Sequence, residues 1–483
     1  MERRNETWRI ELRNALKAKE RADIQRVHMP ELSPEIRRRN TGEVNTGLTA
    51  EMAVSEARRC LDCAKPGCVE GCPVEIDIPS FIKNIERGEF LEAAKILKET
   101  SALPAVCGRV CPQEKQCESK CIHIKMKKEA VAIGHLERFA ADYERVSGQI
   151  SIPETAPANG IRIAVVGSGP AGLSFAGDMV KSGYSVTVFE ALHEVGGVLK
   201  YGIPVFRLPN EIVDVEIDSL RAMGVRFVNN CIVGKTVSID DLKDEGFRGI
   251  FVGSGAGLPR FMNIRGENLV GVMSSNEYLT RVNLMDAANP ESDTPVLTGK
   301  KVAVIGGGNT AMDSVRTALR LGAERAMIIY RRSEEEMPAR LEEVKHAKEE
   351  GIEFMTLRNP VEYRGNENGR VTHVLLQVMK LGEPDASGRR SPVEVPGETE
   401  LIEVDEVVVS VGVSPNPLIP QSVKGLNISR RGTVTVNEET MQSDIPMIFA
   451  GGDIVRGGAT VILAMGDGRR AARAMDKWIR EQS

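Results

Sequence analysis

Beyond residue 160 the chain alternates between short apolar runs and longer stretches with helical spacing. Residues 161–166 and 185–189 are apolar runs with the length of a strand that is buried on both faces. The segment between them has the periodicity of a helix. Residues 301–313 repeat the strand, the turn and the helix, and the apolar run 326–330 follows. This order predicts two α/β units, each built on a parallel sheet.

The first 155 residues lack this pattern and predict a helical domain. Residues 1–45 combine a charged helix with an irregular arm, and residues 78–100 have helical periodicity. Residues 147–160 are rich in Ser, Pro and Ala, a composition that is typical of a linker. We therefore expect a domain boundary near residue 155.

The turn after the first of these strands carries Gly167, Gly169 and Gly172, in the spacing GxGxxG. The first glycine permits a tight turn, the second lets the backbone approach a pyrophosphate, and the third allows close packing of helix and strand. Glu190 ends the second strand, where a carboxylate accepts hydrogen bonds from a ribose. Strand, glycines, helix, strand and acid in this order predict a dinucleotide site.

The second unit repeats the motif with Gly306, Gly308 and Ala311, and its helix begins with Asn309 and Thr310. We expect all five residues to contact a second dinucleotide.

The second strand of this repeat is not followed by a carboxylate. Arg331 and Arg332 stand there, and guanidinium groups bind a 2′-phosphate that a carboxylate would repel. The alternative is that both arginines only face solvent. We favour NADP(H) at this site, with Arg340 as a further candidate ligand.

A second dinucleotide fold beside an NADP(H) site predicts a flavin, FAD, in the first. The strand at residues 448–451 ends in Gly452 and Asp453, and resembles the flavoprotein motif whose aspartate binds the ribityl or pyrophosphate region of FAD. Thr460 begins the following helix, whose N-terminal amides are expected to face the isoalloxazine. Gly197 is expected to approach the cofactor closely, and Arg207 to pair with an anion.

The position of this C-terminal segment implies that the FAD domain is split. We expect a first part at residues 156–290 and a second part at 415–483, with the NADP domain inserted at 291–414.

Eight of the nine cysteines lie between residues 60 and 121, a crowding that favours metal binding over disulfides in a cytosolic protein. Zinc is one reading, but zinc sites usually pair CxxC units and a single CxxC occurs here. Closely spaced cysteines ending in Cys-Pro are typical of ferredoxin loops, in which the last cysteine ligates the other cluster. We therefore predict two [4Fe-4S] clusters. The cysteines are Cys60, Cys63, Cys68 and Cys72, then Cys107, Cys111, Cys117 and Cys121.

These cysteine loops resemble the N-terminal domain of the NADPH-dependent glutamate synthase small (β) subunit family. The same unit occurs in the large subunit of NADH-dependent ferredoxin:NADP oxidoreductase and in dihydropyrimidine dehydrogenase. The resemblance implies that the ligands cross over between the loops, that Glu137 completes the second cluster, and that Cys107 is a spare thiol. The implied ligand sets are Cys60, Cys63, Cys68 and Cys121 for one cluster, and Cys72, Cys111, Cys117 and Glu137 for the other.

The resemblance extends from about residue 45 to the C-terminus and implies an α/β fold: a helical double-cluster domain followed by two nested Rossmann-like domains. It implies an NADPH-dependent oxidoreductase that passes electrons through FAD and the clusters to a partner subunit, in a complex that makes glutamate from glutamine and 2-oxoglutarate. The alternatives are the large subunit of an electron-bifurcating ferredoxin:NADP oxidoreductase, with a small FAD/[2Fe-2S] partner or ferredoxin, and a zinc-stabilised nucleotide-binding module. We expect a hetero-oligomer and no side-chain acid or base catalyst.

Composition agrees with such a protein. The net charge of −5, with both signs interspersed, gives no support for a nucleic-acid partner. The sequence contains no run of about 18 apolar residues, so it predicts no membrane span. The charged N-terminus lacks the apolar core of a signal peptide, so we expect a cytoplasmic location.

Overall fold

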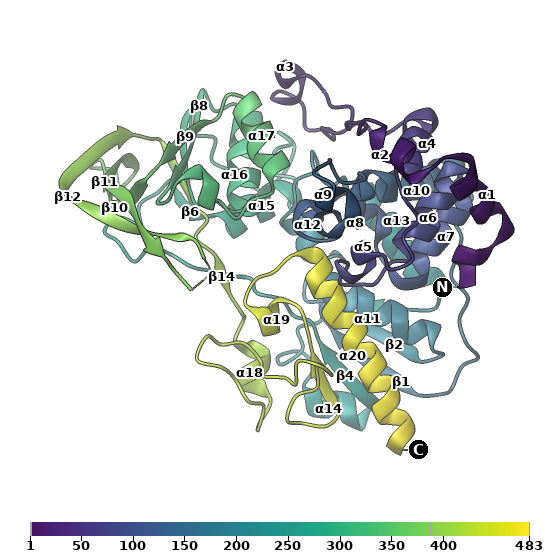
Figure 1. The fold of residues 1–483 in the computed structure, drawn as a ribbon. Coiled ribbons are helices and arrows are strands. Elements are labelled where there is room, and N and C mark those ends of the chain that lie inside the picture. Colours follow the sequence, from purple (N-terminus) through teal and green to yellow (C-terminus); the bar gives the residue numbers. More distant parts are fainter. Residues whose placement is uncertain (1, 387, 483) are drawn as a thin grey trace.

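The computed structural model describes residues 2–386 and 388–482 and contains a helical N-terminal region and two parallel sheets (Figure 1). The elements of the N-terminal region are η1 (Glu2–Asn5), α1 (Thr7–Ala15), α2 (Ala18–Asp23), α3 (Pro34–Arg37), α4 (Ala50–Arg58), α5 (Gly67–Glu70), α6 (Ile78–Glu86), α7 (Phe90–Thr100), α8 (Pro104–Val110), η2 (Gln113–Lys115), η3 (Glu118–Lys120), α9 (Ile122–Lys125) and α10 (Ile133–Ser147). In the N-terminal region, side-chain caps begin α4 and α6: Thr49 accepts a hydrogen bond from the Met52 amide, and Asp77 accepts one from the Ser80 amide.

The first parallel sheet has the strand order β15-β4-β1-β2-β3. Its last strand in sequence, β15, pairs with β4, so the C-terminal segment completes a sheet that begins near residue 162. The strands are β1 (Arg162–Val166), β2 (Ser185–Phe189), β3 (Arg226–Val228), β4 (Phe247–Val252) and β15 (Ile448–Ala450). The accompanying helices are α11 (Pro170–Lys181), α12 (Val198–Tyr201), α13 (Asn210–Ala222), α14 (Ile239–Asp244), α18 (Leu418–Ser422), α19 (Asp453–Arg456) and α20 (Val461–Gln482). We call this sheet with its helices the first unit.

The second parallel sheet has the order β6-β13-β7-β8-β9 and is inserted between β4 and β15. Its strand β6 precedes the expected boundary at residue 290 and pairs with β13. The strands are β6 (Val272–Ser274), β7 (Lys301–Ile305), β8 (Arg325–Tyr330), β9 (Glu353–Thr356) and β13 (Glu406–Val409), and the helices are α15 (Ser275–Asn283), α16 (Asn309–Arg320), η4 (Glu334–Glu336) and α17 (Leu341–Glu349). We call this sheet with its helices the second unit.

An antiparallel sheet extends the second unit, and the sequence pattern did not predict it. Strands β10 (Arg358–Gly365), β11 (Val371–Pro384) and β12 (Arg390–Glu403) form this sheet. The short strands β5 (Leu258–Pro259) and β14 (Val413–Ser414) pair where the chain enters and leaves the second unit. The predicted class, a helical region followed by two nested α/β units, is confirmed.

The helical region and the first unit share one hydrophobic core. Buried side chains of the helical region, such as Phe81 and Val106, belong to the same cluster as Phe175 in α11 and Met465 in α20. Burial of this continuous apolar surface fixes the cysteine loops against the first unit. Figure 1 shows α20 running beside α11.

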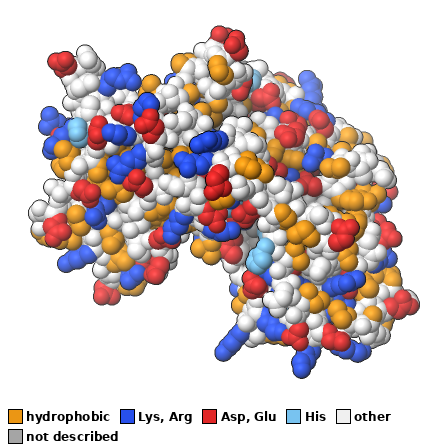
Figure 2. All heavy atoms as spheres, turned by 90° about the horizontal axis from the view of Figure 1, so that it is seen from above, with side chains coloured by type: hydrophobic (Ala, Val, Ile, Leu, Met, Phe, Trp, Pro, Cys, Tyr) orange, Lys and Arg blue, Asp and Glu red, His pale blue; other side chains and the backbone are white. Residues whose placement is uncertain are grey.

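The face that Figure 2 draws carries charges of both signs. Figure 2 shows Lys and Arg side chains interspersed with Asp and Glu over the face that it draws, without a broad patch of one sign. Among the residues that the structure describes, no helix has the length and apolar character needed to cross a membrane.

Candidate functional site

The first glycine loop has the geometry that each of its glycines was expected to provide. Gly167 has a φ of +96°, and a Cβ there would lie 2.7 Å from the carbonyl oxygen of Gly253. A Cβ at Gly172 would lie 2.1 Å from the carbonyl oxygen of Gly167, so helix and strand touch there. Gly169 caps α11, and its Cβ position is open. The loop therefore presents a bare helix N-terminus to open space, which suits an anion.

Glu190 is held beside this loop at the end of β2. Its carboxylate is 5% exposed and accepts hydrogen bonds from the Ser168 amide (2.9 Å) and hydroxyl (2.5 Å), and from the Leu192 amide (2.8 Å). The Ser168 hydroxyl in turn accepts from the Gly196 amide. Because a carboxylate has about four lone-pair sites, Glu190 retains capacity for a further donor.

Gly197 is brought directly against the first loop. It has a φ of +55°, and a Cβ there would lie 2.9 Å from the Cα of Gly169. Only a glycine fits this contact, which packs the segment after β2 against the helix N-terminus.

The C-terminal Gly-Asp motif meets the same loop from the other side. A Cβ at Gly452 would lie 3.0 Å from the Cβ of Ala171 in α11. Asp453 opens α19, and burial raises its pKa to about 6. Thr460 immediately precedes α20, and its hydroxyl accepts a hydrogen bond from the Leu463 amide. The structure thus gathers all the residues expected at the FAD site except Arg207.

Asp467 holds this motif in place and was not predicted from the sequence. Its side chain is fully buried in α20, accepts from the Gly452 amide (3.1 Å), and pairs with Arg456 (2.6 Å) and Arg470. An acidic residue within the apolar sequence Met465-Gly466-Asp467-Gly468 was the available signal, because a lone charge on a buried helix face needs partners.

The second glycine loop repeats the geometry of the first. Gly306 has a φ of +145°, and a Cβ there would lie 2.3 Å from the carbonyl oxygen of Ser410. Gly308 caps α16, where a Cβ would lie 4.0 Å from its nearest neighbour, and Ala311 is fully buried at the third position. Thr310 is exposed at this helix N-terminus, while the Asn309 amide oxygen accepts from the Arg340 amide (2.8 Å).

The two arginines after β8 have different environments. Arg332 is 6% exposed, donates to the Arg390 carbonyl oxygen (2.9 Å) and pairs with Asp385 (2.5 Å). Arg331 is exposed, and its side chain forms no hydrogen bond or ion pair within the described ranges 2–386 and 388–482. The Arg332 guanidinium is therefore engaged by the antiparallel sheet, whereas that of Arg331 is free for a ligand.

Arg207 and Arg340, which were also expected to bind cofactors, are engaged in protein contacts. Arg207 is buried and pairs with Asp313 in α16 (2.7 Å) and Glu343 in α17 (3.1 Å). Arg340 is 5% exposed and donates to the Arg109 carbonyl oxygen and the Gln113 side-chain oxygen, both in the second cysteine loop, residues 107–121. Each guanidinium joins two parts of the chain, although the Nε atoms of Arg207 and Arg340 have no hydrogen-bond partner among the described residues.

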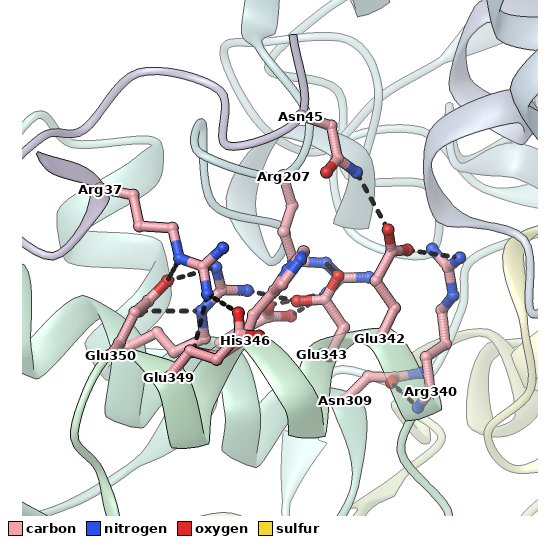
Figure 3. A network of polar contacts seen from close by, with 12 residues as sticks. Arg37, Asn45, Arg207, Asn309, Arg340, Glu342, Glu343, His346, Glu349 and Glu350 are labelled. Atoms are coloured by element: carbon pink, nitrogen blue, oxygen red, sulfur yellow. Dashed lines mark hydrogen bonds and ion pairs between the residues drawn. The ribbon is translucent and has the colours of Figure 1, made fainter. Parts of the chain in front are cut away.

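These arginines belong to a buried polar network that joins the second unit to the N-terminal arm (Figure 3). Arg37 of the arm pairs with Glu31 (3.0 Å), with Glu349 and with Glu350 (3.2 Å). Asn45, also in the arm, donates to Glu342 (3.2 Å). The network fixes α17 against segments that lie about 300 residues earlier in the chain.

One corner of the network resembles a metal site in composition. Oxygen or nitrogen atoms of Glu31, Glu342 and His346 lie within 4.8 Å of one another. However, Glu31 already pairs with Arg37, and Glu342 with Arg340. Because guanidinium groups neutralise both carboxylates, we assign this corner to the contact between arm and second unit.

Glu350→Gln is expected to lower the free energy of unfolding by about 3–5 kcal/mol, because it removes the buried negative charge that several buried arginines share. Glu350 is fully buried and pairs with Arg316 (2.8 Å), Arg320 (2.8 Å) and Arg37. Denaturant titration of the purified holoprotein measures the change. Glu353→Gln, which breaks an exposed pair with Arg325, is the matched control and should cost under about 1 kcal/mol.

The pH dependence of this difference follows from the pKa of Glu350. Burial tends to raise that pKa, but hydrogen bonds from Arg320 and Arg316 outweigh it and hold the pKa at about 2. Because its pKa is depressed, the ionised Glu350 carboxylate stabilises the fold at any pH above the ordinary pKa of 4.5. This stabilisation is lost as pH falls toward 2. The difference should therefore be constant from about pH 8 to pH 5; a change within that range would contradict the assignment.

The charged neighbours of the cysteines fall into two sets that cross between the loops, and Cys107 lies in the second set beside Cys111, Glu137 and Cys72. Burial raises the pKa of Cys68, and Cys60, Cys121 and Cys63 raise it further. Burial likewise raises the pKa of Cys72, with Glu137 and Cys111 as charged neighbours, and that of Cys117, with Glu118, Cys72, Glu137 and Cys111. We call Cys60, Cys63, Cys68 and Cys121 the outer group, and Cys72, Cys111, Cys117 and Glu137 the inner group.

Both donor sets fit a [4Fe-4S] cluster. The outer group offers four thiols, the usual set for such a cluster. The inner group offers three thiols and the Glu137 carboxyl, which is 5% exposed and whose Oε1 has no hydrogen-bond partner. A buried oxygen without a partner is costly unless a ligand satisfies it. Cys107 also lies here, and its thiol donates to the Met465 sulfur at 3.4 Å.

The inner group lies against the first unit. A Cβ at Gly466 of α20 would lie 2.8 Å from the carbonyl oxygen of Pro73, which follows Cys72. The neighbouring Met465 contacts Cys107 through its sulfur, and its carbonyl oxygen accepts from Ser174 of α11. Helix α20, which starts beside Asp453 and Thr460, thus connects the Gly-Asp motif to the inner group.

Two nested dinucleotide folds, with a cysteine-rich helical region packed on the first, define a pyridine nucleotide oxidoreductase that also carries iron–sulfur ligands. The comparisons agree. Residues 37–149 match the family described as dihydropyrimidine dehydrogenase domain II, 4Fe-4S cluster, and residues 161–468 match pyridine nucleotide-disulphide oxidoreductase. The chain belongs to the family of the NADPH-dependent glutamate synthase small chains and their relatives.

Individual relatives span several enzymes. The glutamate synthase [NADPH] small chain of Escherichia coli is 35% identical over 95% of this chain and 98% of its own. The NADP(+)-dependent formate dehydrogenase subunit beta of Moorella thermoacetica is 38% identical over 86% of this chain and 60% of its own. A solved structure, Mycobacterium tuberculosis FprA in complex with NADPH, shares the fold with a TM-score of 0.56 and 21% identity, over 68% of this chain and 85% of that one.

These matches confirm the resemblance predicted from the sequence and the class of the enzyme. The chain is an NADPH-dependent flavoprotein oxidoreductase, and the predicted cofactors, FAD, NADP(H) and [4Fe-4S] clusters, are those of its family.

Proposed function

We propose that this protein is the NADPH-oxidising small subunit of a glutamate synthase, which supplies electrons to a larger amidotransferase-bearing subunit. The observation that carries the proposal is coverage: the chain spans 98% of the Escherichia coli glutamate synthase small chain but 60% of the formate dehydrogenase subunit. This chain thus matches almost the full length of the former, whereas the latter has a further part that this match does not cover. The relatives named as chains or subunits support a hetero-oligomer with a redox partner.

The cofactors are assigned to the domains as follows. The helical domain, residues 1–155, would hold one cluster on the outer group and one on the inner group, with Glu137 as fourth ligand of the latter. The FAD domain would comprise 156–290 and 415–483, and the NADP domain 291–414, with β6 adding a strand to the sheet of the latter. When bound, these groups supply hydride acceptance from NADPH and single-electron transfer toward the partner.

The residues of the chain bind the cofactors and orient them. The bare N-termini of α11 and α16 favour the two pyrophosphates, because backbone amides and the helix dipole point at them. Glu190 is held by Ser168 where it accepts ribose hydroxyls. Asp467 positions the Gly-Asp motif. No acid or base residue is needed, because hydride transfer depends on stacking and positioning.

Arg331→Ala is expected to raise KM for NADPH roughly 10- to 100-fold, since a charge-assisted hydrogen bond to a 2′-phosphate contributes about 1.5–3 kcal/mol. KM for NADH, which lacks that phosphate, should stay unchanged. Dye-reduction kinetics with both nucleotides measure the ratio. Arg325→Ala, which removes an exposed arginine at the start of β8, the strand that Arg331 follows, is the control. Loss of NADPH preference with Arg332→Ala alone would reverse the roles of Arg331 and Arg332.

Anaerobic affinity purification of the tagged chain from its native cell tests the proposed partner. We expect a large subunit with an amidotransferase nucleophile to co-purify, and glutamine-dependent glutamate formation to follow addition of NADPH. A small FAD/[2Fe-2S] subunit in its place would support the bifurcating oxidoreductase. A formate dehydrogenase catalytic subunit would place the chain with its other relatives.

A further inference from the structure

Arg340 joins the second glycine loop to the second cysteine loop. It immediately precedes α17, in extended conformation, and its backbone amide donates to the side-chain oxygen of Asn309 at 2.8 Å. Its guanidinium donates to the carbonyl oxygen of Arg109 (2.7 Å) and to the side-chain oxygen of Gln113 (3.0 Å), and also pairs with Glu342 (2.9 Å). Figure 3 shows Arg340 between Asn309 and Glu342.

One end of this connection lies at the proposed NADP(H) site. Asn309 is the first residue of α16, directly after the capping Gly308. An incoming phosphate at this helix N-terminus would meet the amides beside the Asn309 side chain that holds the Arg340 backbone. A nucleotide bound at the second glycine loop therefore acts on Asn309, which accepts the hydrogen bond from the Arg340 backbone amide.

The other end lies at the inner group. Arg109 and Gln113 stand two residues before and after Cys111. The Gln113 amide also donates to the Cys107 carbonyl oxygen at 3.4 Å, and Arg109 is held by Glu43 and Asp142. The guanidinium of Arg340 is 5% exposed, so bulk water screens its charge little.

This arrangement gives Arg340 a predictable effect on electron affinity. The reduction potential of an iron–sulfur cluster depends on net charge and on hydrogen bonds around it. Glu342 pairs with the Arg340 guanidinium, which also donates to the loop that carries Cys111, where hydrogen bonds and positive charge favour the more negative, reduced cluster. An anionic nucleotide at the Asn309 end opposes that charge and makes reduction less favourable.

We propose that Arg340 is a positioning residue that couples nucleotide binding at α16 to the reduction potential of the cluster held by the inner group. The coupling rests on the proposed function, since it needs both the nucleotide and the cluster. It makes electron release toward the partner more favourable while nucleotide occupies the second unit. By linkage, reduction of the cluster weakens nucleotide binding by the same factor.

Redox titration of the holoprotein, followed by electron paramagnetic resonance, tests this coupling. The probe is 2′,5′-ADP, which carries the 2′-phosphate and a 5′-phosphate but accepts no hydride. In the wild type, saturating probe should change the reduction equilibrium of one cluster roughly five-fold, a shift of about 40 mV to lower potential for one electron. Arg340→Met should start at a lower potential and lose the response.

Two further variants separate charge from structure. Arg340→Lys keeps the charge but cannot hold Arg109 and Gln113 together, so its starting potential should stay near that of the wild type while its response shrinks. Arg325→Met removes an exposed arginine of the same unit and should respond like the wild type. An undiminished response in Arg340→Met would overturn the proposal.

Binding of the probe is measured separately by calorimetry, which distinguishes the two levels of inference. A wild type that binds 2′,5′-ADP without a shift in potential overturns the coupling alone. A wild type that does not bind it overturns the NADP(H) assignment, and the coupling with it.

Discussion

Glu137→Ala is expected to lower the iron content of the purified holoprotein to roughly half, whereas Cys107→Ala should leave it unchanged. Glu137 lies with Cys72, Cys111 and Cys117, is buried, and has an oxygen without a partner. Removal of the carboxyl leaves three ligands for one cluster. Iron and sulfide analysis, with electron paramagnetic resonance of the reduced protein, measures the loss.

Cys107 is the informative comparison because spacing alone places it among the ligands. Its thiol is 1% exposed and donates to the sulfur of Met465, which belongs to the first unit. Glu216→Gln is the matched control for burial: this carboxylate is 3% exposed, and the glutamine oxygen can still accept from the Ala105 amide. Loss of iron in Cys107→Ala with retention in Glu137→Ala would reassign the fourth ligand.

Gly172→Ala is expected to destabilise the first unit by about 3 kcal/mol and to abolish FAD retention. The added Cβ would lie 2.1 Å from the carbonyl oxygen of Gly167, a backbone atom that cannot move without opening the turn. Thermal unfolding and the flavin-to-protein absorbance ratio measure the two effects.

Gly169→Ala distinguishes an effect on FAD binding from an effect on the stability of the fold. Its Cβ would enter open space, and its φ of −71° suits alanine, so the unfolding temperature of the cofactor-free protein should stay near that of the wild type. FAD affinity should fall, because the methyl group occupies the side from which a pyrophosphate approaches. Equal FAD retention in Gly169→Ala and wild type would place the cofactor elsewhere.

The glycine loops were predictable because their determinants are local. The motif lies within six residues, Gly167 to Gly172, and the apolar strand before it indicates where the turn begins. The set of inner ligands came from family resemblance, and spacing alone would have chosen Cys107. The sequence pattern did not predict strands β10 to β12. They form an antiparallel sheet inserted between β9 and β13, and the strand–helix alternation of the second unit does not require it.

The roles of the arginines were not predictable for the opposite reason. Arg332 pairs with Asp385, 53 residues away, and Arg340 reaches Gln113, 227 residues away. Arg207 finds Asp313 in the second unit. The position of an arginine after a strand predicts where its backbone lies. The group with which its guanidinium pairs depends on which distant segments the tertiary fold brings close to it. Arg331, which has no such partner within the described residues, keeps its predicted role as a testable assignment.

Anaerobic mixing of the purified holoprotein with NADPH tests the central claim most directly. The claim is that this single chain takes electrons from NADPH into FAD and delivers them to its clusters. We expect NADPH to bleach the flavin absorbance and to produce the electron paramagnetic resonance signal of a reduced [4Fe-4S] cluster, with NADH far less effective. A protein that contains flavin and iron but is not reduced by NADPH would contradict the account.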